Sequence, residues 1–210
     1  MTEIQRFTPP PFANHSPKTW YQAAAQQPAF IQDAAQARAI EHLDRLWNEL
    51  MMFKRKRNRF LGRSLRSPEV PKGLYFYGGV GRGKSFLMDA FFGCLPYRRK
   101  RRVHFHAFMA EIHRRMRDKR SEQDPLKSVA ADIAEETRVL CFDEFHVSDI
   151  ADAMILGRLL ENLFAHGVVL VATSNYAPSE LYPQGQNRSS FLPTIALIED
   201  KLTILNVDGG

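Results

Sequence analysis

The sequence is poor in the features that mark disulfide-bonded, secreted and membrane-spanning proteins. Its 210 residues include two cysteines, Cys94 and Cys141, each within an apolar run, so we expect buried thiols in a reducing compartment. No stretch approaches the roughly 18 apolar residues of a transmembrane helix. The first residues, MTEIQRFTPPPF, do not form the apolar core of a signal peptide. We therefore expect a cytoplasmic protein. The sequence also contains neither an internal repeat nor a low-complexity tract.

Acidic residues are scarce in residues 1–120, and basic residues are scarce in residues 121–210. Residues 1–120 hold 24 Lys and Arg against 9 Asp and Glu, whereas residues 121–210 hold 5 against 14. The basic excess is concentrated in three clusters, at 54–59, 98–102 and 114–120. Such clusters can bind nucleic acid, an anionic membrane or an acidic protein, or they can pair with the acidic half of the same chain. They are not interleaved with the aromatic residues that stack on single-stranded bases.

The composition, with 44% hydrophobic and 25% charged residues, is that of a globular protein with one domain and a small appendage. Helical periodicity predicts a short helix over about 17–27 and then a longer one. The apolar face of the longer helix consists of Leu43, Leu46, Trp47, Leu50 and Met51. The segment GRSLRSPEVPKG, residues 62–73, reads as a linker because it is rich in proline, glycine and serine.

After Lys72, short apolar runs alternate with longer amphipathic ones. The runs that read as strands are 73–78, 102–106, 138–145, 168–175 and 202–207. Helical segments separate these runs, which is typical of a parallel sheet. We therefore predict an α/β fold with a five-stranded parallel sheet covered by helices on both faces.

The segment GGVGRGKS follows the first predicted strand and precedes a predicted helix. It fits the pattern G-x-x-x-x-G-K-[ST], in which glycines let consecutive backbone N–H groups surround phosphate oxygens at a helix N-terminus. Lys84 would contact the β- and γ-phosphates, and the hydroxyl of Ser85 would bind Mg²⁺. The dinucleotide fingerprint G-x-G-x-x-G does not fit. The residues expected to bind ATP or ADP are Gly78, Gly79, Val80, Gly81, Arg82, Gly83, Lys84, Ser85 and Phe86.

Two adjacent carboxylates, Asp143 and Glu144, end the apolar run RVLCFDEF. Because the carboxyl end of a parallel strand faces the ligand crevice, we expect Asp143 to hold Mg²⁺ and Glu144 to activate a water molecule. The competing interpretation is a pair of residues that caps the next helix. Asn175 follows the next strand and could orient the same water, unless it is an ordinary turn residue.

Arg188 lies late in the chain, in GQNRSSF. It could reach the γ-phosphate bound by a neighbouring subunit and neutralise charge in the transition state, or it could be a surface arginine. Arg158 is a weaker candidate because it lies within an amphipathic helix, where we expect it to form a salt bridge with an acidic residue of the chain. Arg82 is expected to face solvent or a neighbouring subunit.

Three histidines, His104, His106 and His113, raise the question of a metal site. We expect His104 and His106 to lie on one face of a strand. No cysteine or acidic ligand stands beside them at zinc-like spacing, so a polar strand end near the phosphates is the favoured interpretation.

Four segments together resemble one protein family. They are GLYFYGGVGRGKSFLMDAFF, VHFHAFMAEIH, LCFDEFHVSDIADAMILGRLL and GVVLVATSNYAPSELYPQGQNRSSFLPTIALI followed by LNVDGG. From about residue 15 to its end, the chain is similar to the ZapE/AFG-like family of AAA+ ATPases, which act in bacterial cell division and have mitochondrial relatives. FDEFHVSDIADAM and TSNY…LYP are much more specific than a phosphate loop.

The resemblance implies a P-loop, AAA+ type αβα sandwich with strand order 5-1-4-3-2. Gly78–Ser85 would be the Walker A motif, and Asp143 with Glu144 the Walker B motif. Asn175 would be sensor 1 and Arg188 the arginine finger. The resemblance also implies self-association into an oligomer, a protein partner from the division machinery such as an FtsZ-like protein, and contact with the inner membrane face.

We expect two parts: residues 1–71 as an N-terminal helical extension with a linker, and residues 72–210 as the AAA+ nucleotide-binding core. AAA+ modules carry a helical lid after the fifth strand, and this sequence ends there, at LNVDGG. We therefore expect a core whose lid, with its second sensor arginine, is either absent or truncated, and weak hydrolysis.

The predicted function is a Mg²⁺-dependent ATPase that regulates or remodels a protein partner. The first alternative is a nucleic-acid-handling ATPase of the helicase-loader type, which the basic half would favour. The second is a small-molecule or nucleotide kinase, against which the adjacent carboxylates Asp143 and Glu144 argue.

Overall fold

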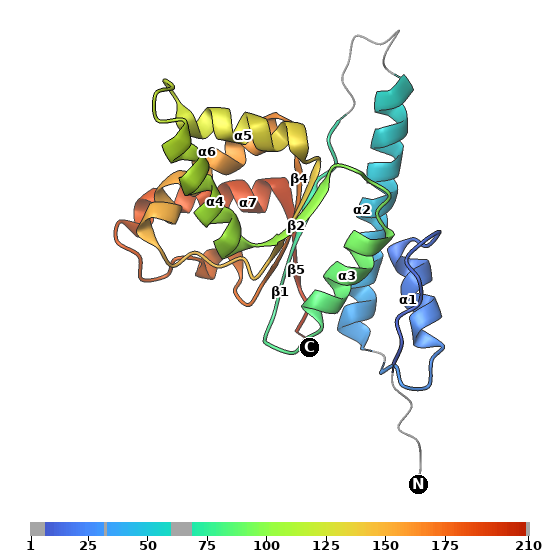
Figure 1. Cartoon of the computed structure of the whole chain (residues 1–210). Coiled ribbons are helices and arrows are strands. Elements are labelled where there is room, and N and C mark those ends of the chain that lie inside the picture. Colours follow the sequence, from blue (N-terminus) through green and yellow to red (C-terminus); the bar gives the residue numbers. More distant parts are fainter. Residues whose placement is uncertain (1–6, 32, 60–68, 209–210) are drawn as a thin grey trace. The chain divides into compact units, whose positions relative to one another are not determined.

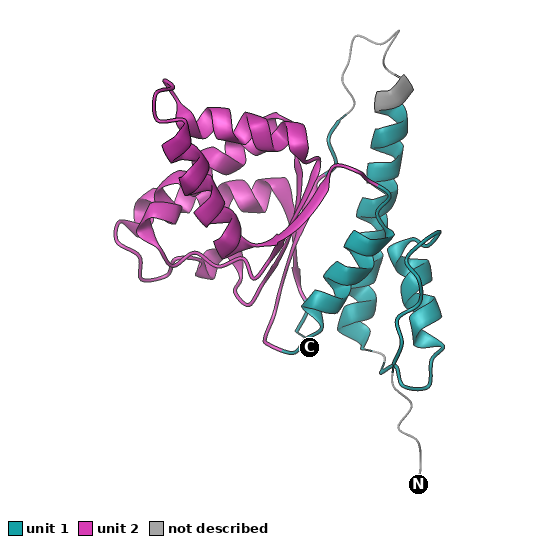
Figure 2. Cartoon of the chain, viewed as in Figure 1, with its two compact units in different colours: residues 1–71, 81–96, 207–210 teal, residues 72–80, 97–206 magenta. Residues whose placement is uncertain are grey.

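The structure is a computed structural model that describes residues 7–31, 33–59 and 69–208, except for the side chains of 57–59. Most of the predicted linker, residues 62–68, lies outside the described residues. The chain divides into two compact units (Figure 2). Unit 1 comprises residues 1–71, 81–96 and 207–210, and unit 2 comprises residues 72–80 and 97–206.

Unit 2 is built on a five-stranded parallel sheet with the order β2-β3-β4-β1-β5. The strands are β1 (Gly73–Tyr77), β2 (Lys100–His104), β3 (Val139–Asp143), β4 (Val169–Ser174) and β5 (Leu202–Asn206). This order is the predicted 5-1-4-3-2 read from the other edge, so the predicted fold class is confirmed. Every residue of β3 and β4 is buried, as is typical of central parallel strands.

Four helices of unit 2 cover one face of this sheet (Figure 1). They are α4 (Phe105–Asp118), α5 (Pro125–Glu136), α6 (Ile150–Ala165) and α7 (Leu192–Lys201). Two short 3₁₀ helices, Pro178–Glu180 and Arg188–Ser190, lie between β4 and α7. The apolar core of the unit is shared by these helices and the sheet. It includes Phe108 of α4 and Phe142 of β3, whose ring centroids lie 4.8 Å apart.

The second strand was predicted two residues too late. We expected residues 102–106, but β2 ends at His104 and α4 begins at Phe105. The helix begins at Phe105 because this residue belongs to the buried apolar face of α4, whose members recur at helical spacing: Phe105, Phe108, Met109 and Ile112. The prediction that His104 and His106 share one strand face is therefore wrong, because His106 lies in the helix.

Unit 1 contains α1 (Pro17–Ala25), α2 (Ala34–Arg59) and α3 (Lys84–Cys94). The predicted helix near 17–27 is present, and the side chain of Ser16 caps it by accepting the backbone N–H of Thr19. Of the predicted apolar face of α2, Leu43, Leu46 and Leu50 are buried, whereas Trp47 and Met51 are half-buried. The indole of Trp47 donates to the carbonyl of Cys94, which ties α2 to α3 at 2.9 Å.

The helix that follows the phosphate loop thus groups with the N-terminal helices in unit 1, while β1 belongs to unit 2. The division into a helical extension, residues 1–71, and a nucleotide-binding core, residues 72–210, stays a prediction. Both cysteines are buried thiols. Within the described ranges, no helix combines the length and the apolar character needed to cross a membrane.

A pair of glycines tests how tightly β1 is packed. A Cβ atom at Gly73 would lie 2.0 Å from the backbone oxygen of Leu170, so Gly73→Ala should lower the free energy of unfolding by about 3 kcal/mol. Gly81 has open space around its Cβ position but a φ of 80°, so Gly81→Ala should cost about 1 kcal/mol. Denaturant unfolding of both variants measures the difference. Equal losses would contradict the close approach of β1 and β4 at Gly73.

Candidate nucleotide-binding site

The carboxyl ends of β1, β3 and β4 meet at one edge of the sheet in unit 2, and hydrogen bonds from β4 connect them. The backbone N–H of Gly78, just after β1, donates to the carbonyl of Ser174 at 3.2 Å. The backbone N–H of Phe145, two residues beyond β3, donates to the carbonyl of Thr173 at 2.7 Å. The first residue of the phosphate loop and the segment after Asp143 are therefore both held by the last residues of one strand.

The phosphate loop has the backbone conformation that its glycines predict. Gly81 and Gly83 have φ values of 80° and 77°, in the left-handed region that glycine adopts without strain. Gly83 is the N-cap of α3, and it has no side chain to occupy the first backbone N–H groups of that helix. Such a helix start offers donors to a phosphate group.

Lys84 is the first residue of α3 and is partly buried. Burial lowers its pKa, and the nearby carboxylate of Asp208 opposes this shift. The ammonium group is therefore in a place where an added anion would stabilise its charge. Arg82 pairs with the same carboxylate at 3.4 Å between Nε and Oδ1, so it has a partner in its own chain.

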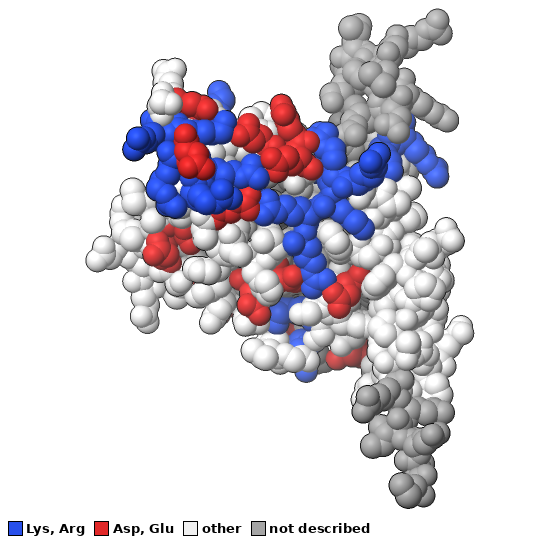
Figure 3. Space-filling model, viewed as in Figure 1, with Lys and Arg blue, Asp and Glu red and all other residues white. Residues whose placement is uncertain are grey.

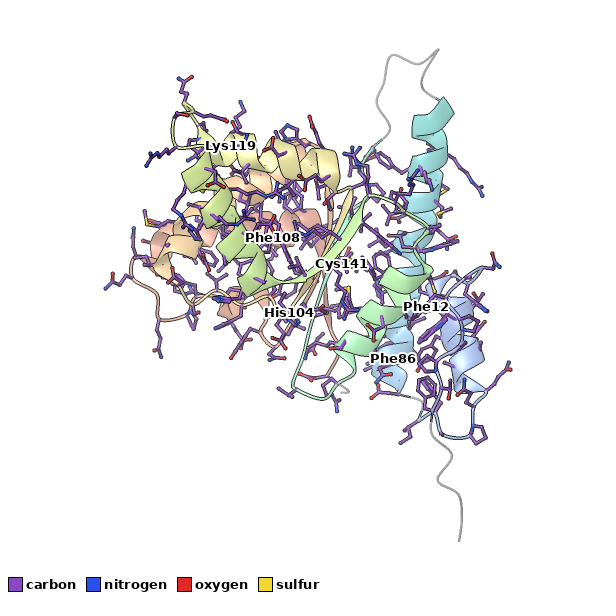
Figure 4. All side chains as sticks on the ribbon, in the orientation of Figure 1. Phe12, Phe86, His104, Phe108, Lys119 and Cys141 are labelled. Atoms are coloured by element: carbon purple, nitrogen blue, oxygen red, sulfur yellow. The ribbon has the colours of Figure 1, made fainter. Side chains whose placement is uncertain are left out.

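Phe86, the last residue of the predicted phosphate-binding set, lies in an aromatic cluster with the N-terminal segment (Figure 4). Its ring centroid is 5.1 Å from that of Trp20 and 5.6 Å from that of Phe30. A Cβ atom at Gly83 would lie 2.5 Å from the side-chain nitrogen of Gln36. The N-terminal segment and α2 therefore contact the end of the loop and the start of α3 directly.

Asp143 ends β3 with a side chain that is 12% exposed. Both of its carboxylate oxygens accept hydrogen bonds from Arg102, at 2.6 Å from Nε and 3.2 Å from Nη2. A carboxylate oxygen is the type of ligand that Mg²⁺ prefers, so the residue predicted to hold the metal fits that role chemically. Arg102 was not singled out from the sequence, where it was one of five basic residues in a row.

Glu144 has an unusual backbone and an exposed side chain. Its φ of 56° lies in the left-handed region, and its N–H donates to the hydroxyl of Thr173 at 3.2 Å. The side chain is 80% exposed, with the imidazole Nδ1 of His104 at 3.7 Å from its Oε2. His104 lies opposite Asp143 in the register of β2 and β3 and is labelled in Figure 4. His104 is therefore a polar residue at a strand end, as the favoured interpretation of this histidine predicts.

Asn175 and Arg188 both lie beyond β4. Asn175 follows its last residue and is exposed. Arg188 begins the second 3₁₀ helix, and its guanidinium donates to the carbonyl of Ser179 at 2.6 Å. Arg158 pairs with Asp124 at 2.7 Å, so the predicted salt bridge is present.

Several residues of the basic clusters in unit 2 pair with acidic residues of the same unit. Arg115 contacts both Glu111 and Glu136, and Lys119 contacts both Glu122 and Asp132. Basic and acidic side chains accordingly intermingle on the face shown in Figure 3. Among the described residues, no group of three His, Cys, Asp or Glu could hold a metal ion. His113 instead lies 2.7 Å from Asp152, between Nε2 and Oδ1.

Comparison with known families decides the assignment. The family model described as AFG1-like ATPase matches residues 15–210. The chain belongs to the AFG1-like ATPase family. A relative of this AFG1-like chain is cell division protein ZapE of Escherichia coli K12, which is 42% identical over 206 residues. The match covers 93% of the chain but 55% of that protein, so the chain spans about half the length of this relative.

Solved structures confirm the fold of the AFG1-like chain. The crystal structure of DnaI matches with a TM-score of 0.57 at 17% identity, over 84% of this chain and 87% of that one. The AMPPCP-bound DnaA from Aquifex aeolicus matches with a TM-score of 0.56 at 14% identity, over 86% and 49% of the two chains. At these identities the likeness extends to the arrangement of strands and helices and no further.

The left-handed backbone of Glu144 can be tested by stability alone. Glu144→Ala and Glu144→Gly both remove an exposed side chain, but only glycine adopts a φ of 56° without strain, so the glycine variant should be more stable by about 1 kcal/mol. Glu161, exposed within α6, provides the control, because there glycine should be less stable than alanine by about 1 kcal/mol. Thermal unfolding measures both pairs. The same sign at both positions would show that Glu144 is not strained.

Proposed function

We propose that this AFG1-like chain contains the nucleotide-binding core of a Mg²⁺-dependent ATPase, with residues 72–210 as the core and 1–71 as its helical extension. The observation that carries the proposal is the meeting of β1, β3 and β4 at one edge. There the first residue of the phosphate loop and the segment after Asp143 bond to the end of the same strand. An open parallel sheet binds ligands at this edge.

Binding is assigned to the loop and to the residues after it. The backbone N–H groups of Gly78–Ser85 would surround the phosphates, and Lys84 would donate to the β- and γ-phosphate oxygens. The hydroxyl of Ser85 and the carboxylate of Asp143 would hold Mg²⁺, which neutralises phosphate charge when bound. The aromatic cluster around Phe86 supports a role for the N-terminal segment as a wall beside the nucleotide.

Hydrolysis is assigned to Glu144, Asn175 and Arg188. The carboxylate of Glu144 would take the proton of the attacking water, and the side-chain amide of Asn175 would orient that water. Arg188 would act on the nucleotide of a neighbouring copy and neutralise charge that develops on the transferred phosphoryl group. Its bond to the carbonyl of Ser179 gives the guanidinium a fixed starting position.

The partner is proposed from the family. A relative with 42% identity is a cell division protein, which supports a cytoplasmic role on a division-machinery partner such as an FtsZ-like protein. Association with the anionic inner membrane face belongs to the same proposal. The nucleic-acid alternative loses part of its support, because Arg115, Lys119 and Arg102 pair with carboxylates of their own unit.

Replacement of the Glu144 carboxylate by an amide tests whether Glu144 is the general base. Glu144→Gln should keep ATP binding and lower the rate of phosphate release by about a hundredfold, because the amide cannot accept the proton of the attacking water. Lys84→Ala is the comparison variant and should lose binding itself. Fluorescent nucleotide titration and phosphate release measure the two properties. Normal turnover by Glu144→Gln would rule out its role as base.

A concentration series tests Arg188. If a neighbouring copy supplies this side chain, activity per molecule should rise with protein concentration, and Arg188→Ala should abolish the rise with a loss of about a hundredfold or more. Arg158→Ala, which removes another partly exposed arginine bound to its own chain, should keep the rise. Phosphate release over the series gives the result. A rise that survives in Arg188→Ala would exclude Arg188 as the residue supplied in trans.

A further inference from the structure

We propose that Arg102 competes with Mg²⁺ for Asp143 and thereby sets the Mg²⁺ concentration at which the site binds nucleotide. The proposal rests on the proposed function, in which Asp143 holds the metal. It assigns to Arg102 the role of a positioning residue: an internal cation that occupies the carboxylate when Mg²⁺ does not.

The contact between the two residues engages the whole carboxylate. Arg102 Nε donates to Oδ2 at 2.6 Å, and Nη2 donates to Oδ1 at 3.2 Å. This two-point arrangement between a planar guanidinium and a planar carboxylate is stronger than a single charged hydrogen bond. Both side chains are largely buried, with 22% of Arg102 and 12% of Asp143 exposed, so solvent screens the pair only in part.

The topology places this pair at the edge where the nucleotide is proposed to bind. β2 pairs in parallel with β3, and Arg102 stands opposite Cys141 while His104 stands opposite Asp143. Arg102 is thus two residues from the end of its strand, and its long side chain extends to the last residue of the neighbouring strand. The contact is contained in unit 2.

Arg102 is the cation whose donors lie at both oxygens of the Asp143 carboxylate. Glu144 is exposed and lies beside the imidazole of His104. A divalent cation at Asp143 would meet a guanidinium at both carboxylate oxygens, and like charges at such distances repel strongly in a partly buried site.

Mg²⁺ would therefore replace the Arg102 guanidinium at Asp143 only above a certain Mg²⁺ concentration. Mg²⁺ must break or weaken the pair with Arg102 before it can use the Asp143 oxygens, so part of its binding free energy is offset by the lost pair. Without Arg102, Asp143 would be a partly buried carboxylate that has lost this partner, which costs stability and favours a metal ion. Removal of Arg102 should therefore tighten Mg²⁺ binding.

The neighbouring Arg101 offers a matched control. It lies on the same strand, its side chain is 28% exposed, and it forms a two-point pair with Glu111 of α4. Arg101→Gln removes the same charge and a comparable ion pair, but it leaves Asp143 untouched. General effects of net charge on metal binding would appear in both variants, whereas the competition would appear in Arg102→Gln alone.

The test is a Mg²⁺ titration of mant-ADP binding, followed by fluorescence at constant ionic strength. In Arg102→Gln the Mg²⁺ concentration for half-maximal binding should fall about tenfold relative to the unaltered chain, and in Arg101→Gln it should stay within about twofold. Arg102→Lys, which keeps a cation but not the two-point geometry, should fall in between. An unchanged or higher Mg²⁺ requirement in Arg102→Gln would overturn the proposal.

A second measurement separates this proposal from the proposed function. Mg²⁺ alone should raise the thermal unfolding temperature more in Arg102→Gln than in the unaltered chain, because the ion replaces the lost partner of Asp143. If the unaltered chain does not bind mant-ADP at saturating Mg²⁺, the proposed function fails, and this metal-only shift still decides the role of Arg102. Equal Mg²⁺ shifts in the two proteins would show that Arg102 merely supports the fold.

Discussion

The end of strand β4 is the point on which the candidate site depends. Its last two residues, Thr173 and Ser174, accept hydrogen bonds from the chain after β1 and after β3. These bonds exist because the strands run parallel and in a register that brings three carboxyl ends together. A shift of one residue would turn the buried side chains of β4 to the other face, so the apolar core and the position of the site are fixed by the same pairing.

Two features of this edge lower the stability of the fold but hold charged groups in place. Glu144 adopts a backbone conformation that most residues avoid, and Asp143 is a carboxylate with little exposure. Each is supported by a neighbour: Thr173 accepts the N–H of Glu144, and Arg102 pairs with Asp143. Strained or charged groups that are held in place by their surroundings are typical of functional sites, and they are the reason for assigning chemistry to this edge.

The sequence was informative where a local pattern has one structural solution. The alternation of apolar runs led to the five-stranded parallel sheet, and the glycines of the phosphate loop led to the positive φ values at Gly81 and Gly83. α5 was missed, although Asp124 caps it, Pro125 begins it and its buried residues follow helical spacing. Here the pattern was present in the sequence and was overlooked.

Long-range contacts were beyond what the sequence could predict. The pair between Arg102 and Asp143 joins residues 41 positions apart, and one arginine among five consecutive basic residues carries no local mark of its partner. The cluster of Trp20 and Phe30 around Phe86 depends on how the N-terminal helices pack onto α3. The balance of the charged halves was visible as a total, but the individual pairs, such as Arg115 with Glu136, depend on the fold.

We propose that the phosphate loop and the carboxylates at the end of β3 bind one nucleotide. Hydrogen–deuterium exchange with and without AMPPCP and Mg²⁺ tests it most directly, since it reports on both segments in one experiment. Bound nucleotide should slow exchange in residues 78–86 and in residues 143–146 together. Slower exchange in the loop alone, with residues 143–146 unchanged, would contradict it.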